Sequence, residues 1–476
     1  MGDKLRELED NAHRRSLGFH LTPRSLFLEY ILPDIEDKLW KHTWMDLFAG
    51  EGNLILPILD SINPNERIGF FKNHIYLFDI QEEMIQKSIE NAETYGIPSK
   101  IASNNIKLRD NLESFPISLI KSEYPLYHIT NPPYLYLGYI RKHSNTHQYL
   151  KLFEGINQGY QDLYQIAMIN DLRSDLENLI YIIPSNFLYG ASVSNKFRLD
   201  FLMNYNINRM MIFETKMFEY TGTNICIGFF KKKKENKFED QEFLGLKFKK
   251  SDISIEKVYN LKPEFKYRAG HEFDEFSRDY RANNPLKVKY YLLKEEVQRS
   301  NGSNEIKVID ANDYKKNTYT KIILHLNDNL KEKIESNILY VRTVDTGSYN
   351  GRVGLGIIAK DFNVKGIYVS GNTYRTHPIQ IFIEPRITQE DQILLKSYFN
   401  FILETFRESL DSEFLTTYKY SKALYTRKYL GLTQVRLLIE TLPILDMNKS
   451  NKTELNELIN KNLYNKILDF LNKMRI

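Results

Sequence analysis

Four residues that follow an apolar run carry the most specific chemical signal in this sequence, Asn131-Pro132-Pro133-Tyr134. Two consecutive prolines fix the backbone and lack amide hydrogens, so the carbonyls beside them have no neighbouring donors. The Asn131 side-chain oxygen and the Pro132 carbonyl would form a rigid pair of acceptors for one amino group, and the Tyr134 ring would stack on a planar base. The plain alternative is a proline-rich turn at the end of a strand.

A glycine-bearing turn with the sequence DLFAGEGN follows another apolar run and begins at Asp46. Small residues let a backbone approach a ligand closely, and in open α/β sheets such turns lie where ligands bind. The turn lacks both the Gly-Lys-Ser/Thr ending of a phosphate-binding loop and the GxGxxG of dinucleotide sites. Its two acids, Asp46 and Glu51, suit a cationic ligand.

Two further acids come after expected strands. Asp79 ends the run at 74–78, in the place of an acid that binds ribose hydroxyls, and Ile80 would lie beside an adenine ring. Asp110 could accept a hydrogen bond from an exocyclic amine, although a loop acid or helix cap is the alternative. Asp79 is unusually far from the glycine turn, which we attribute to an inserted loop at 60–73.

The flanking residues predict strands alternating with helices through the first half. Expected strands are 43–48, 74–78, 126–130, 179–183, 209–213 and 224–230, and expected helices include 23–32, one from residue 53, and 81–95. This alternation predicts a mostly parallel, doubly wound α/β sheet with helices on both faces.

The second half differs from the first in its predicted structure. A four-lysine run at 231–234 predicts a boundary between a domain at 1–235 and a mixed α+β domain at 236–476. Within the latter, residues 391–411 and 452–474 are expected to be helical.

In their order, these motifs resemble the amino-group DNA methyltransferases that use S-adenosylmethionine, specifically N6-adenine enzymes of restriction-modification systems with the gamma motif order. The resemblance covers roughly residues 15–232 and includes Gly18 to Pro23, which resembles the family's N-terminal cofactor motif. It implies a class I methyltransferase fold, with a Rossmann-like doubly wound sheet at 1–235 and a target recognition domain at 236–476.

The resemblance also implies which residues act. Those expected to contact the cofactor are Thr22, Pro23, Asp46, Phe48, Ala49, Gly50, Glu51, Gly52, Asp79, Ile80 and Asp110. Asn111 departs from the family, whose members often have an apolar or aromatic residue there. Phe218, ahead of Thr221-Gly222-Thr223-Asn224, resembles a second ring that stacks on the target base, with Tyr220 as a competitor and a plain core position as the alternative.

The implied chemistry is direct transfer of a methyl group to an amine. Asn131 and the Pro132 carbonyl would hold the amine hydrogens, so that positioning and electrostatics supply most of the catalysis. No strong general base and no metal are needed. Because the amine is unreachable inside a duplex, the adenine must flip out between Tyr134 and the second ring.

Three polar segments of the second half could contact double-stranded DNA, namely 348–356, 370–377 and 416–429. Arg352 and Arg375 are candidates for reading base edges, and Lys419, Lys422, Arg427 and Lys428 are candidates for phosphate contacts. Solvated polar loops are the alternative reading of each segment.

Composition excludes several classes of protein. The 476 residues contain 65 Lys and Arg against 61 Asp and Glu, a net charge of +4 that does not locate a basic surface. One cysteine, Cys226, excludes a disulfide framework and a Cys-rich zinc module. It has no preceding proline and lies in an apolar run, so a covalent cytosine-C5 mechanism is not expected. Without an apolar run of ~20 residues or a signal peptide, we expect a cytoplasmic protein.

Other functions remain open at this stage. N4-cytosine DNA methyltransferases use the same geometry, and so do enzymes that methylate RNA or protein glutamine. A different class is a non-catalytic DNA-binding specificity protein with a decayed methylase fold. We expect a monomer on DNA and, since no nuclease motif is present, functional pairing with a separate restriction endonuclease.

Overall fold

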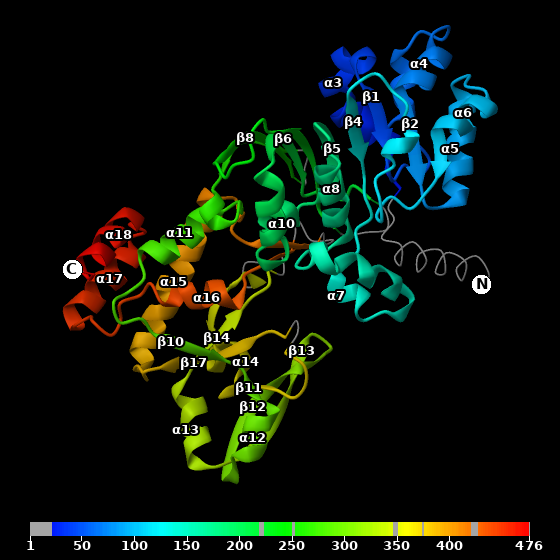
Figure 1. Ribbon diagram of the computed structural model, residues 1–476. Helices are drawn as coiled ribbons and strands as arrows, with labels where there is room; N and C mark the ends of the chain where they lie inside the picture. Colours follow the sequence, from blue (N-terminus) through cyan, green and yellow to red (C-terminus); the bar gives the residue numbers. More distant parts are fainter. Residues whose placement is uncertain are drawn as a thin grey trace. The chain divides into compact units, whose positions relative to one another are not determined.

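The computed structural model describes residues 21–218, 223–249, 253–345, 351–373, 376–419 and 427–475 (Figure 1). The chain divides into two compact units, of which the first extends to Ala269 and also takes in a short segment from Lys419, and the second begins at Gly270. The first unit therefore extends past the predicted boundary at 235. The reason is that β8 (Gln241–Phe248) pairs with β6 and β9 (Ser254–Leu261) pairs with β8, so the four-lysine run marks the end of a strand within one sheet.

The first unit is built on a nine-stranded sheet in the order β3-β2-β1-β4-β5-β7-β6-β8-β9. Its remaining strands are β1 (Thr43–Asp46), β2 (Ile75–Asp79), β3 (Ile106–Leu108), β4 (Leu126–Thr130), β5 (Asn178–Pro184), β6 (Tyr205–Phe213) and β7 (Ile225–Lys232). Pairing is parallel from β3 to β5, as predicted. Strand β7 instead runs antiparallel to β5 and β6. The connection at 214–224 is shorter than the dozen or more residues that a parallel crossover needs, so the chain returns as an antiparallel strand.

The helices of this unit are α2 (Arg24–Tyr30), α3 (Leu32–Ile35), η1 (Glu36–Lys41), η2 (Leu56–Ser61), α4 (Arg67–His74), α5 (Glu82–Thr94), α6 (Ser99–Asn105), η3 (Ile117–Leu119), α7 (Leu137–Ile140), η4 (Ser144–Phe153), η5 (Gly155–Asn157), α8 (Leu163–Arg173), α9 (Asn186–Tyr189), α10 (Ser192–Leu202) and η6 (Pro263–Phe265). Two predictions were wrong here. The helix expected from residue 53 is only the 3-10 helix η2, and the supposed loop at 60–73 contains most of α4, whose Phe70 and Phe71 are fully buried.

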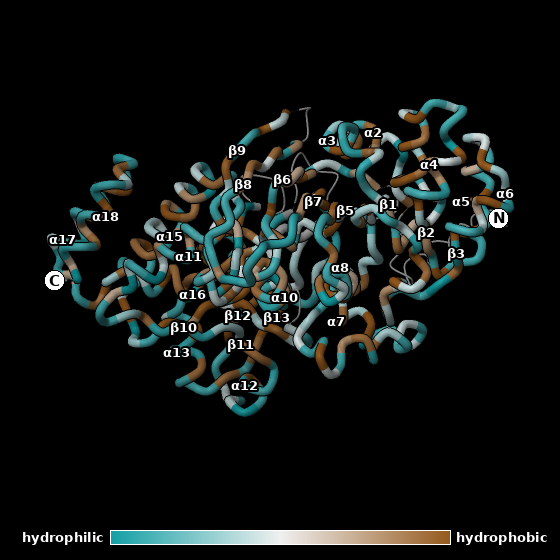
Figure 2. Tube along the Cα trace, turned by 45° about the horizontal axis from the view of Figure 1, so that its top comes forward, coloured by the Kyte–Doolittle hydropathy of each residue, from teal (hydrophilic) through white to brown (hydrophobic). Residues whose placement is uncertain are grey.

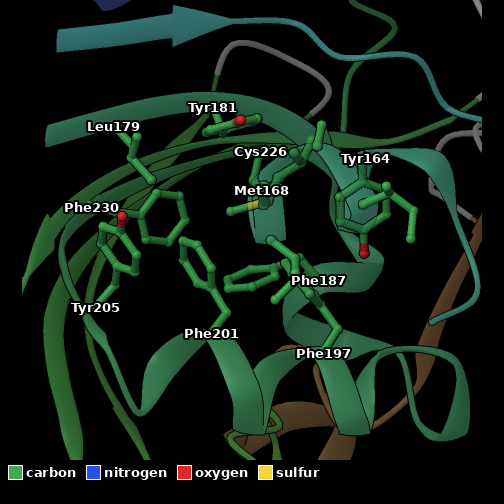
Figure 3. Packing of buried hydrophobic residues seen from close by; sticks show 14 of the residues in the cluster. Tyr164, Met168, Leu179, Tyr181, Phe187, Phe197, Phe201, Tyr205, Cys226 and Phe230 are labelled. Carbon is green, nitrogen blue, oxygen red and sulfur yellow. The ribbon is translucent and has the colours of Figure 1, made fainter. Parts of the chain in front are cut away.

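Helices cover both faces of the sheet because its strands are apolar on both sides. Successive residues alternate between two cores: Leu179, Tyr181 and Ile183 pack in one, while Ile180 and Ile182 pack in the other. Figure 2 shows hydrophobic residues gathered along central strands such as β5 and β7. In the first core, α8 and α10 pack aromatic side chains against the sheet around the buried Cys226, whose thiol pKa is raised by burial (Figure 3).

The order of the strands places a topological switch point between β1 and β4. From β1 the chain proceeds outward through β2 and β3, and then returns to the other side of β1 to form β4. In open α/β sheets such a reversal leaves a crevice at the carboxyl ends of the strands, where ligands bind. The four predicted polar motifs follow β1, β2, β3 and β4, so the fold brings all of them to this edge.

The second unit contains two four-stranded sheets. One joins β10 (Lys287–Tyr290), β17 (Ile379–Glu384), β14 (Leu339–Arg342) and β15 (Gly354–Ile357), and the other joins β11 (Leu292–Leu293), β16 (Gly366–Val369), β12 (Asn301–Lys315) and β13 (Thr318–Leu326). Strands β18 (Thr416–Lys419) and β19 (Arg427–Tyr429) form a separate pair.

Its helices are α11 (His271–Asp279), α12 (Lys294–Arg299), α13 (Asp328–Ser336), α14 (Ile358–Phe362), α15 (Gln389–Ser409), α16 (Leu432–Ile439), α17 (Lys449–Asn460) and α18 (Tyr464–Lys473). The mixed α+β composition agrees with the prediction. Residues 452–474 are helical as predicted, and the chain turns between α17 and α18 at Asn462, which has a φ of +55°. Within the described residues, no helix is both long and apolar enough to cross a membrane.

Candidate functional site

A cavity opens where β1 to β4 end and holds about 560 Å³ of empty space, part of it open to solvent. Among its lining residues are seven that the sequence predicted, namely Phe48, Asp79, Ile80, Asp110, Asn131, Pro132 and Pro133. Ile80 is 51% exposed, which is unusual for a large apolar side chain at the end of a buried strand, and suits a flat apolar ligand.

A second, smaller hollow of about 260 Å³ lies on the other side of Phe48, which lines both spaces. Its walls include five further predicted residues, namely Thr22, Asp46, Ala49, Gly50 and Glu51. The two hollows together account for all but two of the predicted cofactor contacts. Pro23 is exposed at the start of α2, and Gly52 lines neither hollow.

The glycine turn is tied to the end of β2 by its backbone. The Gly50 amide donates to Asp79 Oδ2 at 2.8 Å, and the Ala49 amide donates to the Phe78 carbonyl at 2.9 Å. Gly52 has a φ of +82°, and a Cβ there would meet the Leu56 side chain at 2.6 Å. Gly52 therefore serves the conformation of the turn and its packing, which explains why it lies outside both hollows.

Asp79 is almost fully buried, at 4% exposure, and burial raises the pKa of its carboxyl. Backbone amides oppose that rise, because Oδ2 accepts from Gly50 and Oδ1 accepts from Gln81 at 2.9 Å. Each carboxylate oxygen can accept a second hydrogen bond. Asp79 can therefore orient the glycine turn and still receive hydroxyl donors from the cavity that it lines.

Asp46 is a buried acid whose hydrogen bonds only partly offset the cost of burying its charge. It is 1% exposed, and Oδ1 accepts from the Phe48 amide at 2.9 Å and from Thr130 Oγ1 at 2.5 Å. Burial raises the pKa of Asp46 to about 7, against the opposing effects of Thr130, His128 and the Phe48 amide. A cation in the adjoining hollow would stabilise the charged form of this carboxylate.

Asn131 is held in one orientation by two neighbours. Its Nδ2 donates to Thr22 Oγ1 at 2.9 Å, and its Oδ1 accepts from the Tyr134 hydroxyl, which also lies 2.6 Å from the Ile182 carbonyl oxygen. Asn131 is 9% exposed and lines the larger cavity. The side-chain oxygen is therefore rigidly placed at the cavity wall, and Thr22 connects it to the smaller hollow.

Tyr134 and Phe218, which were predicted to stack on the target base, do not line the larger cavity. The ring of Tyr134 meets Tyr164 edge-on, and its hydroxyl points toward Asn131 and β5. Phe218 is 4% exposed and packs in the core on the face of α5, so the structure supports the core alternative for this residue. Tyr220 lies outside the described residues, as do residues 18–20.

Sequence reasoning missed several lining residues, chiefly Leu112 and Tyr149. The departure at Asn111 has a structural cause: its Nδ2 donates to the Leu47 carbonyl at 2.8 Å, and the next residue, Leu112, adds apolar surface to the cavity. Tyr149 comes from η4, and burial together with the nearby Asp110 raises the pKa of its hydroxyl. No local motif marks Tyr149, so only the tertiary structure could identify it.

In the second unit, several predicted DNA-contacting segments leave the sheets at one end. Register pairs Arg342 with Gly354 and Val341 with Ile379, so the residues next to Arg342, Gly354 and Ile379 lie at the same edge of this sheet. An isolated bridge joins Val344 to Tyr429 there. We call the described residues 343–345, 351–353, 370–373, 376–378 and 427–430 the polar end.

The predicted DNA-contacting residues differ in exposure and in their hydrogen-bond partners. Arg352 lies at the polar end, half-exposed, with Nη1 2.8 Å from a carboxylate oxygen of Glu404. Lys428 is buried at 8% exposure, and its ammonium donates to the Asp411 carbonyl at 3.2 Å, so the predicted phosphate contact is not supported. Arg375 and Lys422 lie outside the described residues, and the side chains of Lys419 and Arg427 are not described.

No group of three or more His, Cys, Asp or Glu side chains in the described ranges could hold a metal ion. The acids that line the two hollows are Asp46 and Glu51 in the smaller one and Asp79 and Asp110 in the larger one.

Comparison with known proteins agrees with this architecture. The profile of the N-6 DNA Methylase family matches residues 12–325. Among curated proteins, none matches the sequence. Solved structures with a similar fold include the type IIL restriction-modification enzyme MmeI in complex with DNA, at 11% identity, a TM-score of 0.52, and coverage of 94% of this chain and 71% of that one.

Another is a nuclease-deletion mutant of the type ISP restriction-modification enzyme LlaGI in complex with a DNA substrate mimic, at 12% identity, a TM-score of 0.51, and coverage of 93% and 46%. A modification subunit of a type I restriction enzyme from Vibrio vulnificus matches at 16% identity with a TM-score of 0.37, over 59% of this chain and 58% of that one. The chain thus covers 58% of the Vibrio protein, 71% of MmeI and 46% of LlaGI. The predicted fold class is confirmed.

Proposed function

Because the chain belongs to the N-6 DNA methylase family, we propose that it transfers a methyl group from S-adenosylmethionine to the N6 amine of an adenine flipped out of double-stranded DNA. The observation that carries the proposal is the position of Asn131-Pro132-Pro133-Tyr134. This tetrapeptide follows β4 at the switch point and three of its residues line the cavity that also holds Asp79 and Asp110.

The residues of the two hollows fit the proposed cofactor. Asp79 offers carboxylate oxygens for ribose hydroxyls, Ile80 and Leu112 offer apolar surface for an adenine ring, and Asp110 offers an acceptor for its amine. Asp46 and Glu51 line the smaller hollow and suit the cationic methionine part. When bound, S-adenosylmethionine supplies an electrophilic methyl group on a sulfonium centre.

The protein's part in the reaction is to position the amine. Asn131 Oδ1 and the Pro132 carbonyl would accept the two amine hydrogens and direct the nitrogen lone pair toward the methyl group. Proton removal can follow attack, so the site needs no strong base. In the structure Asn131 Oδ1 already accepts one hydrogen bond, from Tyr134, and an oxygen with two lone pairs can accept another.

Double-stranded DNA is the proposed substrate, with the second unit supplying most of the sequence discrimination. MmeI and LlaGI were solved with DNA or a DNA mimic, and this chain shares their fold over most of its length. We propose a role in a restriction-modification system, paired with an endonuclease activity that this chain need not contain. N4-cytosine methylation is the alternative that uses the same acceptors.

The deciding experiment is sequencing that detects modified bases on DNA from a host that expresses this chain. We expect N6-methyladenine at one short sequence motif, absent from a host that expresses Asn131→Ala. N4-methylcytosine would identify the alternative. Unmodified DNA, together with a purified chain that does not bind S-adenosylmethionine, would indicate a non-catalytic DNA-binding protein.

Cofactor affinity should depend on pH through Asp46. Its pKa in the folded protein is about 7 against an ordinary 3.8, so its contribution to stability is present below pH 3.8 and is lost as pH rises toward 7. A cationic ligand favours the carboxylate, so binding should tighten by up to about tenfold between about pH 6 and about pH 8. Calorimetric titration of the wild type and of Asp46→Asn measures this.

The Asp46→Asn variant should bind more weakly and lose most of this dependence on pH. Burial also raises the pKa of the partly exposed Asp162 to about 7, so only the difference between the two proteins isolates the contribution of Asp46. An equal pH dependence in both proteins would remove Asp46 from the cation site.

Arg352→Ala tests the reading of bases at the polar end. If Arg352 leaves Glu404 to contact a base edge, its loss should relax preference for one base pair by ~1–3 kcal/mol. Arg386 is a matched control, because it is also ion-paired, with Glu332, but follows the opposite end of β17. Competition binding with single-base variants of the target duplex should show relaxed preference in Arg352→Ala and none in Arg386→Ala.

A further inference from the structure

Three buried polar side chains that the proposed chemistry does not use form a hydrogen-bonded cluster, and one of them contacts the start of the glycine turn. Asp171 on α8 has its Oδ2 2.5 Å from His128 Nδ1 on β4, and the Tyr181 hydroxyl on β5 donates to the same oxygen at 2.6 Å. All three residues are fully buried. A cluster of ionisable groups removed from water in this way is costly unless its hydrogen bonds stabilise it.

The other nitrogen of His128 faces the turn itself. The Leu47 amide donates to His128 Nε2 at 3.2 Å. An amide can only donate, so Nε2 must be unprotonated, and the carboxylate of Asp171 requires the proton on Nδ1. The two contacts thus demand the same tautomer, and the partner of one ring nitrogen determines the state of the other.

Leu47 is the residue where β1 ends and the turn begins. The paired register of β1 with β2 stops at Asp46, so the Leu47 peptide no longer takes part in the ladder. Two side chains replace it: His128 on the neighbouring strand β4 accepts from the Leu47 amide, and Asn111, in the connection after β3, donates from Nδ2 to the Leu47 carbonyl at 2.8 Å. The two peptide groups that flank Leu47, one shared with Asp46 and one with Phe48, are therefore each held by a side chain.

We propose that Asp171 and His128 are positioning residues for the cofactor. Asp171 selects the tautomer of His128, and His128 holds the Leu47 amide. Leu47 in turn sets the direction of the Asp46 carboxylate and of Phe48, which borders both hollows. The charged and titratable groups facing His128 are Asp171 from α8, Tyr181 from β5 and Asp46 from β1. The identity of the ligand rests on the proposed function.

Two amide substitutions at His128 separate positioning from simple packing. In His128→Gln the amide group reaches the place of Nε2 and can accept from Leu47, whereas in His128→Asn it reaches only the place of Nδ1 and can bond only to Asp171. We expect His128→Gln to bind S-adenosylhomocysteine within about twofold of wild type, and His128→Asn to bind it about fivefold to tenfold more weakly. A purely structural role would penalise both variants alike.

Asp171→Asn with Tyr181→Phe forms a second matched pair. The asparagine amide can donate to Nδ1 and favour the tautomer that opposes the Leu47 amide, so affinity should fall by about fivefold to tenfold. Tyr181→Phe removes a hydrogen bond from the same carboxylate but leaves the tautomer unchanged. It should lower the melting temperature and leave affinity within about twofold.

Isothermal titration with S-adenosylhomocysteine, beside thermal melting of each full-length variant, gives the readout. Equal affinities for the Gln and Asn variants at His128, or a loss in Tyr181→Phe as large as in Asp171→Asn, would overturn the positioning role alone. If His128→Asn does not fold, the Asp171 pair decides the same question. A wild-type chain that binds no S-adenosylhomocysteine would overturn the proposed function and the positioning role together.

Discussion

Replacing Asn131 by alanine is expected to reduce methyl transfer by about a hundredfold or more. The physical reason is the loss of one of two acceptors that would hold the target amine with its lone pair toward the methyl group. Asn131 is not one of the acids that are expected to bind the cofactor. S-adenosylmethionine and DNA should therefore still bind with near wild-type affinity. Single-turnover transfer to a duplex substrate, beside separate binding titrations, measures the effect.

Tyr134→Phe is the matched control for this variant. It keeps the ring and removes only the hydroxyl, which donates to Asn131 Oδ1 and lies 2.6 Å from the Ile182 carbonyl oxygen. We expect Tyr134→Phe to retain most of the transfer, since the oxygen of Asn131 becomes less occupied. Near wild-type turnover in Asn131→Ala would show that Asn131 is not the acceptor.

Asp79→Ala should weaken cofactor binding much more than it lowers turnover at saturating cofactor. A buried pair of ribose hydroxyls would lose a charged acceptor, which costs about 1.5–3 kcal/mol, or roughly tenfold to 150-fold in the dissociation constant. The structure adds a second cause, because the Gly50 and Gln81 amides would also lose their acceptor. Calorimetry gives the affinity, and initial rates at raised cofactor concentration give the turnover.

Asp79→Asn distinguishes these two causes. Its amide oxygen can still accept from Gly50, but its charge is gone and its Nδ2 would face the Gln81 amide. We expect its affinity to lie between those of the wild type and Asp79→Ala. If the dissociation constant of Asp79→Ala equals that of the wild type, Asp79 does not contact the cofactor.

Short-range patterns in the sequence determined most of the strands of the first unit and the residue types of its site. The strand at 126–130 was predicted at the residues that β4 occupies. Strand ends followed by Asp79 or Asn131 are local signals, because apolar runs and turn residues act over a few positions. Parallel strands also share one carboxyl edge, so the grouping of these residues could be expected without coordinates.

Only the tertiary structure decided features that depend on contacts between distant residues. Strands β8 and β9 belong to the first unit because β8 pairs with β6 across more than thirty positions and β9 pairs with β8. Lys428 is buried, and its ammonium donates to the carbonyl of Asp411, a residue distant in the sequence. Asn111 holds Leu47, and His128 holds it from the opposite side, although neither belongs to a local motif. Pairing and burial depend on which elements meet in space, and local periodicity does not encode that information.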